Sequence, residues 1–134
     1  MDAQDEIAAA AAKFYAALNT LFEGDAAPML EVWSHADDIT YMGPDGGYQS
    51  GWAAIRAEWE MQAAKKLGGH VGSADMRITV AGDLAVTHNH EKGENINTGG
   101  KPGAVSIRAT NVFRKENGAW KMIGHHTDML PFLS

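Results

Sequence analysis

The 134-residue chain contains no cysteine, which excludes disulfide bonds and metal sites built from thiolates. It also lacks any run of lysine and arginine, and its formal net charge is −6 with a pI near 5.4. An acidic surface repels phosphate backbones and anionic lipid headgroups. We therefore expect no nucleic-acid partner and no membrane partner, whereas the charge favours neutral or cationic small ligands.

Long apolar runs are missing as well, since no stretch approaches the roughly 20 residues that span a bilayer. Residues 1–7 are acidic where a secretory signal would carry positive charge. Together with the missing cysteines, this predicts a cytoplasmic protein. A hydrophobic fraction of 45% is typical of globular chains. The length suits one core, so we expect residues 1–134 to form a single domain.

Apolar residues at helical spacing predict three helices in the first half of the chain. The first follows residues 7–22 and ends at Gly24, and Asp25 can cap the second. Ser50 can cap the third, which ends at Gly68-Gly69. The helices are therefore concentrated at the front of the chain.

Later residues alternate between apolar and polar, which is typical of antiparallel strands. Segments 74–80 and 84–91 form one expected hairpin, and the strand 105–114 follows. The glycine-rich segment 93–103 between them is expected to be a flexible connection. Helices in front and strands behind predict an α+β domain in which the helices cover one face of the sheet.

Some strands carry apolar residues on both sides. The residues concerned are Val105, Ile107, Val112 and Phe113. A monomer would leave one of these faces in water, where a large apolar patch is unfavourable. We therefore expect a homodimer formed across the sheet.

Residues 110–128 give the strongest local signal, with two alternating segments separated by Asn117-Gly118. The turn is either a two-residue Asn-Gly turn or a three-residue loop with Gly118 left-handed at a bulge. We prefer the three-residue loop, which makes Asn111, His125 and Thr127 neighbours on one face. In either case His125 and the next residue, His126, point to opposite faces, so one imidazole faces the interior.

Three segments carry a resemblance to a known family: residues 13–19 (KFYAALN), residues 50–56 (SGWAAIR), and residues 117–120 (NGAW) followed by the histidine pair. They resemble the NTF2-like superfamily, which includes ketosteroid isomerases, SnoaL-like polyketide cyclases and the association domain of calcium/calmodulin-dependent kinase II. The resemblance implies a cone-shaped α+β fold, in which N-terminal helices pack on a curved, mixed, mainly antiparallel sheet. It also implies a ligand pocket in the cone and a dimer across the sheet.

The chain departs from the ketosteroid isomerases at the residues that carry their chemistry. Phe14 stands where those enzymes have a tyrosine, and Gly43 stands before a proline where they have an aspartate base. Tyr15 and Asp38 are not expected to substitute, because each lies off the required position and should face another direction. We therefore expect no appreciable steroid isomerase activity.

The resemblance to the kinase association domain is also incomplete. Glu91, Asn111 and Thr127 stand where that domain lines its pocket with arginines. A pocket for anions is therefore not expected here. The same three residues, being polar and on strands, become candidates for contacts to a different ligand.

We predict His125 as the catalytic acid or base, with Asn111 and Tyr41 orienting the substrate. The residues that we expect to contact ligand are Phe14, Trp33, Tyr41, Trp52, Asn89, Glu91 and Thr127. The helical spacing of Trp52 and Trp59 fits plain core packing equally well. His88 and His90 share a strand face and could bind zinc or copper, but further ligands are missing. We expect no metal and no cofactor.

These features leave two classes of function open. In one, the protein binds a small apolar or weakly polar molecule and acts as an isomerase, cyclase or dehydratase. In the other, it is a noncatalytic binding or oligomerisation module like the association domain. Polar residues near one sheet face favour chemistry, whereas the missing isomerase pair favours binding alone.

Overall fold

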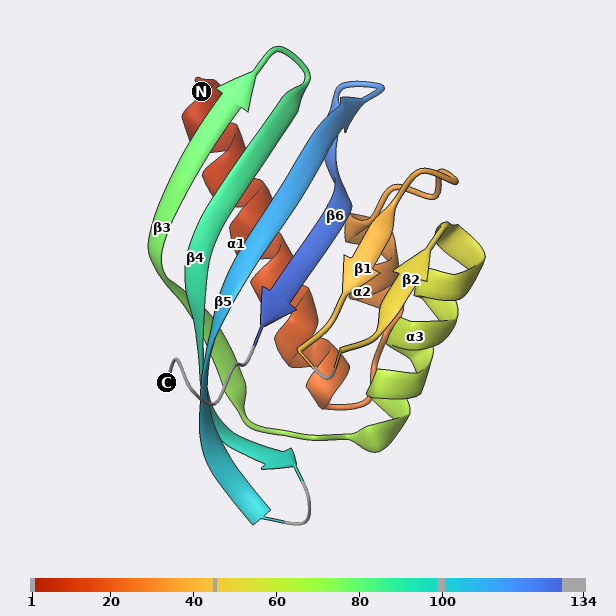
Figure 1. Ribbon diagram of the computed structural model, residues 1–134, viewed down its shortest axis with the longest axis vertical. Helices are drawn as coiled ribbons and strands as arrows, with labels where there is room; N and C mark the ends of the chain where they lie inside the picture. The colour runs from red at the N-terminus through yellow and green to blue at the C-terminus, as the bar shows by residue number, and fades with distance from the viewer. Residues whose placement is uncertain (1, 45, 99–100, 129–134) are drawn as a thin grey trace.

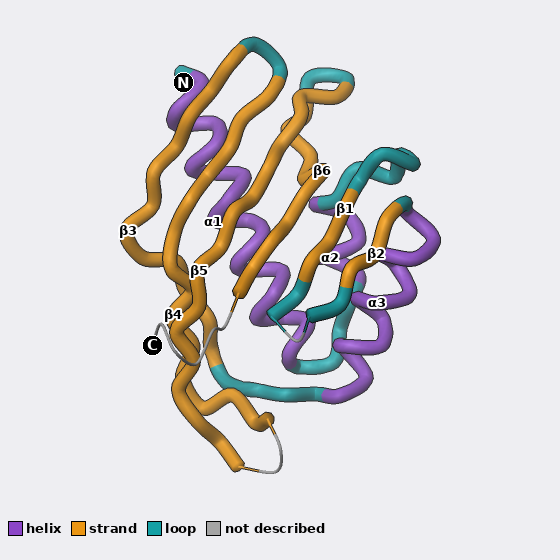
Figure 2. Tube along the Cα trace, in the orientation of Figure 1, coloured by secondary structure: helices purple, strands orange, loops and turns teal. Residues whose placement is uncertain are grey.

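Helices cover one face of a curved sheet in the computed structural model, which describes residues 2–44, 46–98 and 101–128 (Figures 1 and 2). The helices and strands are α1 (Ala3–Phe22), α2 (Ala27–Val32), β1 (Thr40–Met42), β2 (Tyr48–Ser50), α3 (Trp52–Lys65), β3 (His70–Ala81), β4 (Leu84–Thr98), β5 (Lys101–Glu116) and β6 (Ala119–Asp128). Among the described residues, no helix combines the length and apolar character needed to cross a membrane.

The six strands are arranged in the order β2-β1-β6-β5-β4-β3. Strands β1 and β6 are parallel, and the other neighbours are antiparallel. This sheet, with α1 packed along it (Figure 1), confirms the predicted α+β fold with a mixed, mainly antiparallel sheet. We call the face toward α1 the inner face and the opposite face the outer face.

Helix α1 forms because its apolar residues recur on one side and its start is capped. The Asp2 side chain accepts a hydrogen bond from the Asp5 backbone N–H at 2.9 Å, which satisfies one of the free N–H groups of the first turn. Phe14 and Leu21 are completely buried against the sheet and the other helices. The helix therefore covers the inner face of the sheet.

Helix α3 begins differently from our prediction. Ser50 lies in β2, and the residue before the helix is Gly51, whose φ of 84° favours glycine and which gives no side-chain cap. The buried side of α3 consists of Ile55, Trp59 and Ala63. The Trp59 ring packs on Tyr41 of β1, with ring centroids 4.8 Å apart, and so joins the third helix to the edge of the sheet.

The segment 93–103 was predicted as a flexible connection, and this prediction was wrong over most of its length. Strand β4 continues to Thr98 and β5 begins at Lys101, so these residues pair with one another, and a bulge lies between Gly93 and Ile96. Pairing satisfies the backbone groups that a loop would leave to water. Figure 1 shows these strand ends extending beyond the rest of the sheet.

The turn between β5 and β6 also corrects our preference. Glu116 pairs with Ala119, and both Asn117 and Gly118 have positive φ, as a two-residue turn of the mirror-image type requires. A bulge at Ile123 then shifts the register by one residue. The shift places Asn111 opposite His125, so the two residues are neighbours on one face as predicted.

Candidate functional site

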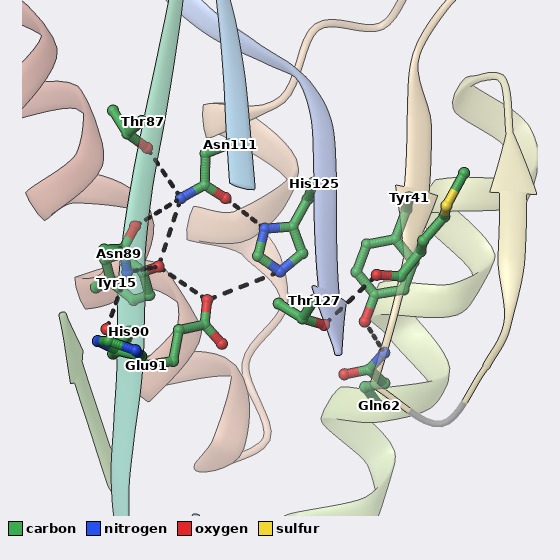
Figure 3. A network of polar contacts seen from close by, with 11 residues as sticks. Tyr15, Tyr41, Gln62, Thr87, Asn89, His90, Glu91, Asn111, His125 and Thr127 are labelled. Atoms are coloured by element: carbon green, nitrogen blue, oxygen red, sulfur yellow. Dashed lines mark hydrogen bonds and ion pairs between the residues drawn. The ribbon is translucent and has the colours of Figure 1, made fainter. Parts of the chain in front are cut away.

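A row of polar side chains lies on the inner face of strands β4 to β6 (Figure 3). Every member is at most 7% exposed, and the members are Thr87, Asn89, Glu91, Asn111, His125 and Thr127. Alternation along each strand brings them to the same face. Burying such groups is unfavourable unless they form hydrogen bonds. The hydrogen bonds of these side chains therefore determine the geometry of the site.

Tyr15 of α1 lies at the centre of this row. Its hydroxyl donates to Glu91 Oε2 at 2.8 Å and accepts hydrogen bonds from the Nδ2 atoms of Asn89 and Asn111 at 2.8 and 3.4 Å. We expected Tyr15 to face elsewhere, and that expectation was wrong. The buried side of α1 is wide enough to include both Phe14 and Tyr15.

Asn111 fixes the orientation of His125. The Asn111 amide nitrogen donates to Thr87 Oγ1 at 3.2 Å, so its carbonyl oxygen faces His125 Nδ1. A carbonyl oxygen can only accept, and therefore Nδ1 carries the hydrogen of the neutral ring. Nε2, on the opposite side of the ring, therefore has a free lone pair, and this atom lies 3.8 Å from Glu91 Oε2.

Burial changes the protonation of this site. It raises the pKa of Glu91 to about 7, although the hydrogen bond from Tyr15 acts in the opposite direction. Burial, with a smaller contribution from His126, lowers the pKa of His125 to about 3, so its imidazole is neutral at physiological pH. We predicted His125 as the catalytic acid or base, a role that requires its imidazole to titrate near neutral pH. The expectation of such a titration was wrong, because the group that titrates there is the Glu91 carboxyl.

Tyr15 keeps its proton throughout this range. Burial and the Glu91 carboxyl both raise the pKa of its phenol above the ordinary value. The hydroxyl is therefore a permanent donor to Glu91. The proton that can leave this site near pH 7 belongs to Glu91.

A cavity of about 300 Å³ lies beside the polar row, within the size range of small-molecule sites. Its lining comprises Leu18, Phe22, Tyr41, Pro44, Trp59, Gln62, Leu67, Val71, Glu91, Gly93, Ile96, Ala104, Ile107, His125 and Thr127. Most of these side chains are apolar. The polar groups are Gln62, Glu91, His125 and Thr127, together with the Tyr41 hydroxyl, which accepts a hydrogen bond from Gln62 Nε2 at 3.0 Å.

Four of the predicted site residues line this cavity: Tyr41, Glu91, His125 and Thr127. Asn89 and Asn111 lie behind them and connect to the cavity through Tyr15 and His125. The remaining candidates are Phe14, Trp33 and Trp52. None of these three lines the cavity.

Phe14 and Trp33 belong to the core, and Phe14 packs against the His125 ring with centroids 5.0 Å apart. Trp52 lies apart from the site, with its ring stacked on His35 at 3.8 Å. Sequence reasoning missed Gln62 as a lining residue and treated Trp59 as possible core. Their spacing of three residues on α3 was a usable signal, because it puts them on one helix face.

The outer face has a hollow of about 420 Å³, larger than the inner cavity. It is lined by solvent-exposed charged residues and includes His88 and His90, the pair considered for metal binding. His90 Nδ1 lies 3.0 Å from an Asp75 carboxylate oxygen. No group of three or more metal-ligating side chains occurs among the residues that the structure describes.

Known proteins resemble this chain in sequence or in structure. The family model for a SnoaL-like domain matches residues 7–130. No curated protein matches the chain. Solved structures do match, at identities that show the fold alone.

One matching structure is a proposed dehydratase of the NTF2-like family from Streptomyces avermitilis, with 23% identity, coverage of 94% of each chain and a TM-score of 0.82. Another is an NTF2-like protein of unknown function from Pseudomonas putida KT2440, with 22% identity, 97% and 89% coverage and a TM-score of 0.79. A third is a proposed calcium/calmodulin-dependent protein kinase type II association domain from Thiobacillus denitrificans, with 24% identity, 91% and 93% coverage and a TM-score of 0.77.

Proposed function

We propose that this chain, which belongs to the SnoaL-like domain family, binds a small, mainly apolar molecule in its inner cavity and moves a proton on it. One observation carries the proposal, which is the buried Glu91 carboxyl in the cavity wall. Its Oε2 atom accepts a hydrogen bond from the Tyr15 hydroxyl at 2.8 Å and lies 3.8 Å from His125 Nε2. A carboxyl with a pKa raised to about 7 can both accept and return a proton at neutral pH.

Glu91 and His125 form a complementary pair. When Glu91 is protonated, it can donate a proton, while the Nε2 lone pair of neutral His125 can accept a hydrogen bond. Both groups reach the same cavity, so a substrate there would meet a proton-exchanging carboxyl and a fixed hydrogen-bond acceptor together. The carboxyl suits isomerisation, cyclisation or dehydration, because these reactions need a proton taken from one atom and given to another.

Isomerisation of a ketone with a C=C bond one carbon beyond the carbon beside its carbonyl group illustrates the role of Glu91 in its deprotonated form. The Glu91 carboxylate would take a proton from the carbon beside the carbonyl group. The electron pair of that C–H bond would form a C=C bond to the carbonyl carbon, and the π pair of the carbonyl group would move onto its oxygen. The same proton would then return to the far carbon of the original C=C bond, so that the carbonyl group re-forms, the C=C bond moves next to it and the carboxylate is restored. The apolar lining would exclude water and hold the body of the substrate.

The second candidate is a noncatalytic binding module. The observation that favours it is the fold similarity to the proposed kinase association domain. In this case the cavity would hold a ligand without changing it. Measurement of proton exchange on a bound ligand separates the two candidates.

The test uses 1-indanone, an uncharged two-ring ketone, in deuterated buffer at neutral pH, with NMR detection of exchange at the carbon beside the carbonyl. We expect the wild-type protein to accelerate exchange. Glu91→Gln should lower the protein-dependent rate at least about a hundredfold and retain binding. Glu94→Gln is the matched control, because Glu94 is an exposed carboxyl on the same strand. This variant should accelerate exchange on the ketone as much as the wild-type protein does.

Three outcomes would count against the proposal. Unchanged exchange in Glu91→Gln would show that another group moves the proton. Binding of the ketone without any protein-dependent exchange would favour the noncatalytic module. Absence of binding by the wild-type protein would overturn the proposed ligand class.

A further inference from the structure

Glu91 lies in the cavity wall without a cation beside it. It is faced by the Tyr15 hydroxyl from α1 and by the His125 ring from β6, and Asn89 of its own strand donates to the same hydroxyl. Tyr15 and Asn89 are uncharged, and burial keeps the His125 imidazole neutral. Of the described residues that line the cavity, none is a lysine or an arginine. When Glu91 loses its proton, its negative charge therefore has no counter-ion among the described lining residues.

One oxygen of this carboxyl is turned away from the hydrogen-bond network. Glu91 Oε2 accepts from Tyr15 and faces His125, whereas Figure 3 shows the second oxygen pointing away from these partners. The Glu91 side chain is only 6% exposed, so water gives it little solvation. An acceptor of this kind, on the lining of a cavity, is suited to a donor carried by the ligand.

Aromatic rings line the same cavity. Phe22, Tyr41 and Trp59 are all part of its wall, and each ring has a negative face that attracts cations. A positive group that entered would lose water but would lie near these rings and the carboxylate. The carboxylate has already lost most of its own water on folding, and a cation would offset that cost.

We propose that the cavity binds molecules in which a protonated amine is attached to an apolar body, with the ammonium group beside Glu91 and the body against the aromatic wall. This inference rests on the cavity of the proposed function and names a ligand class for it. A bound ammonium group would hold Glu91 as the carboxylate. Such amines should therefore inhibit any proton transfer by Glu91.

The test compares three probes of nearly equal size by calorimetry: 2-naphthylmethylamine, 2-naphthylmethanol and 2-naphthoate. At pH 8 we expect the amine to bind about tenfold more tightly than the alcohol and the carboxylate to bind most weakly. At pH 5.5, where Glu91 is protonated, the advantage of the amine should largely disappear. Glu91→Gln should remove it at both pH values, whereas Glu94→Gln should keep it.

A second measurement needs no variant. Near pH 7 the wild-type protein should release protons when it binds the amine, because the cation displaces the proton of Glu91. The release appears as a binding enthalpy that changes with the ionisation enthalpy of the buffer. The alcohol should show no such dependence.

The outcomes separate this inference from the proposed function. If the alcohol binds as tightly as the amine at pH 8, or if Glu91→Gln keeps the preference, the amine inference is wrong while the cavity remains a ligand site. If no proton is released on amine binding, Glu91 is not the contact. If neither the amine nor the alcohol binds the wild-type protein, the cavity and the proposed function both fail.

Discussion

Two adjacent histidines on β6 show how differently the two faces of the sheet behave. His125 is on the inner face, where it is 6% exposed and its ring touches Phe14 and Asn111. His126 is on the outer face and is exposed to solvent. The two residues are chemically identical, and the environment alone makes His125 a neutral, fixed hydrogen-bonding group.

The same contrast extends over the neighbouring strands. On the outer face, the charged side chains pair in contact with solvent, as Arg108 and Asp128 do at 2.8 Å. Such pairs contribute little to stability because water screens them. On the inner face, Glu91 and Asn111 are shielded from water and depend on specific partners. We therefore expect substitutions on the inner face to have large effects and those on the outer face small ones.

The largest effect should be that of Glu91→Gln on the pH dependence of the free energy of unfolding. The pKa of Glu91 is raised from 4.5 to about 7 by folding, so the wild-type protein loses stability as the pH rises through that interval. The glutamine variant cannot ionise. Its free energy of unfolding relative to wild type should therefore increase by about 2.5 kcal/mol between pH 5 and pH 8.

Urea unfolding at the two pH values measures this change. Glu94→Gln replaces an exposed carboxyl on the same strand and should show almost no such pH-dependent gain. Equal behaviour of the two variants would mean that burial does not distinguish Glu91 from an exposed carboxyl.

The next largest effect should come from Asn111→Ala. Asn111 is completely buried and bonds to both His125 and Thr87, so the substitution leaves buried polar atoms without partners. We expect a loss of about 2 kcal/mol in the free energy of unfolding. Thr110→Ala, one residue away and on the outer side, should change it by less than about 0.5 kcal/mol. A similar loss in both variants would contradict the contrast between the faces.

The smallest effect concerns the association of two chains. We propose that a second copy of the chain covers the outer face. Three of the four strand residues behind our dimer prediction divide between the faces: Ile107 and Phe113 are buried on the inner side, whereas Val112 is half-buried on the outer side. The side chain of the fourth, Val105, lies outside the part of the chain that the structure describes. Light scattering at micromolar concentration should give twice the chain mass of 14.4 kDa. Thr110→Arg, which adds a charge within the outer hollow, should weaken the dimer about tenfold with little change in folding. A wild-type monomer would contradict the proposal.

The local patterns determined most of the fold. Apolar residues at helical spacing predicted α1, and alternation predicted the strands, because the two periods place apolar residues on one side of each element. Local patterns failed where long-range pairing intervened. The glycines of segment 93–103 indicated a loop, but pairing between β4 and β5 keeps most of the segment in strands.

The sequence also determined which residues were available for the site, and it suggested Glu91, Asn111 and His125. Asn111 and His125 were predicted to be neighbours because of a three-residue loop, whereas a two-residue turn followed by a bulge at Ile123 brings them together. A bulge depends on contacts between strands, and neither strand encodes it alone. Sequence patterns alone therefore left the register undecided.

Only the tertiary structure decided how the site is protonated. The placement of Tyr15 beside Glu91 joins residues 76 positions apart in the chain, and no local pattern specifies such a contact. Burial then raises the pKa of Glu91 and lowers that of His125, which reverses the roles suggested by their ordinary values. The sequence by itself determined the helices, the strands and the set of polar residues. The packing of α1 on the sheet decided their protonation, because the loss of water around a charge is a property of the whole fold.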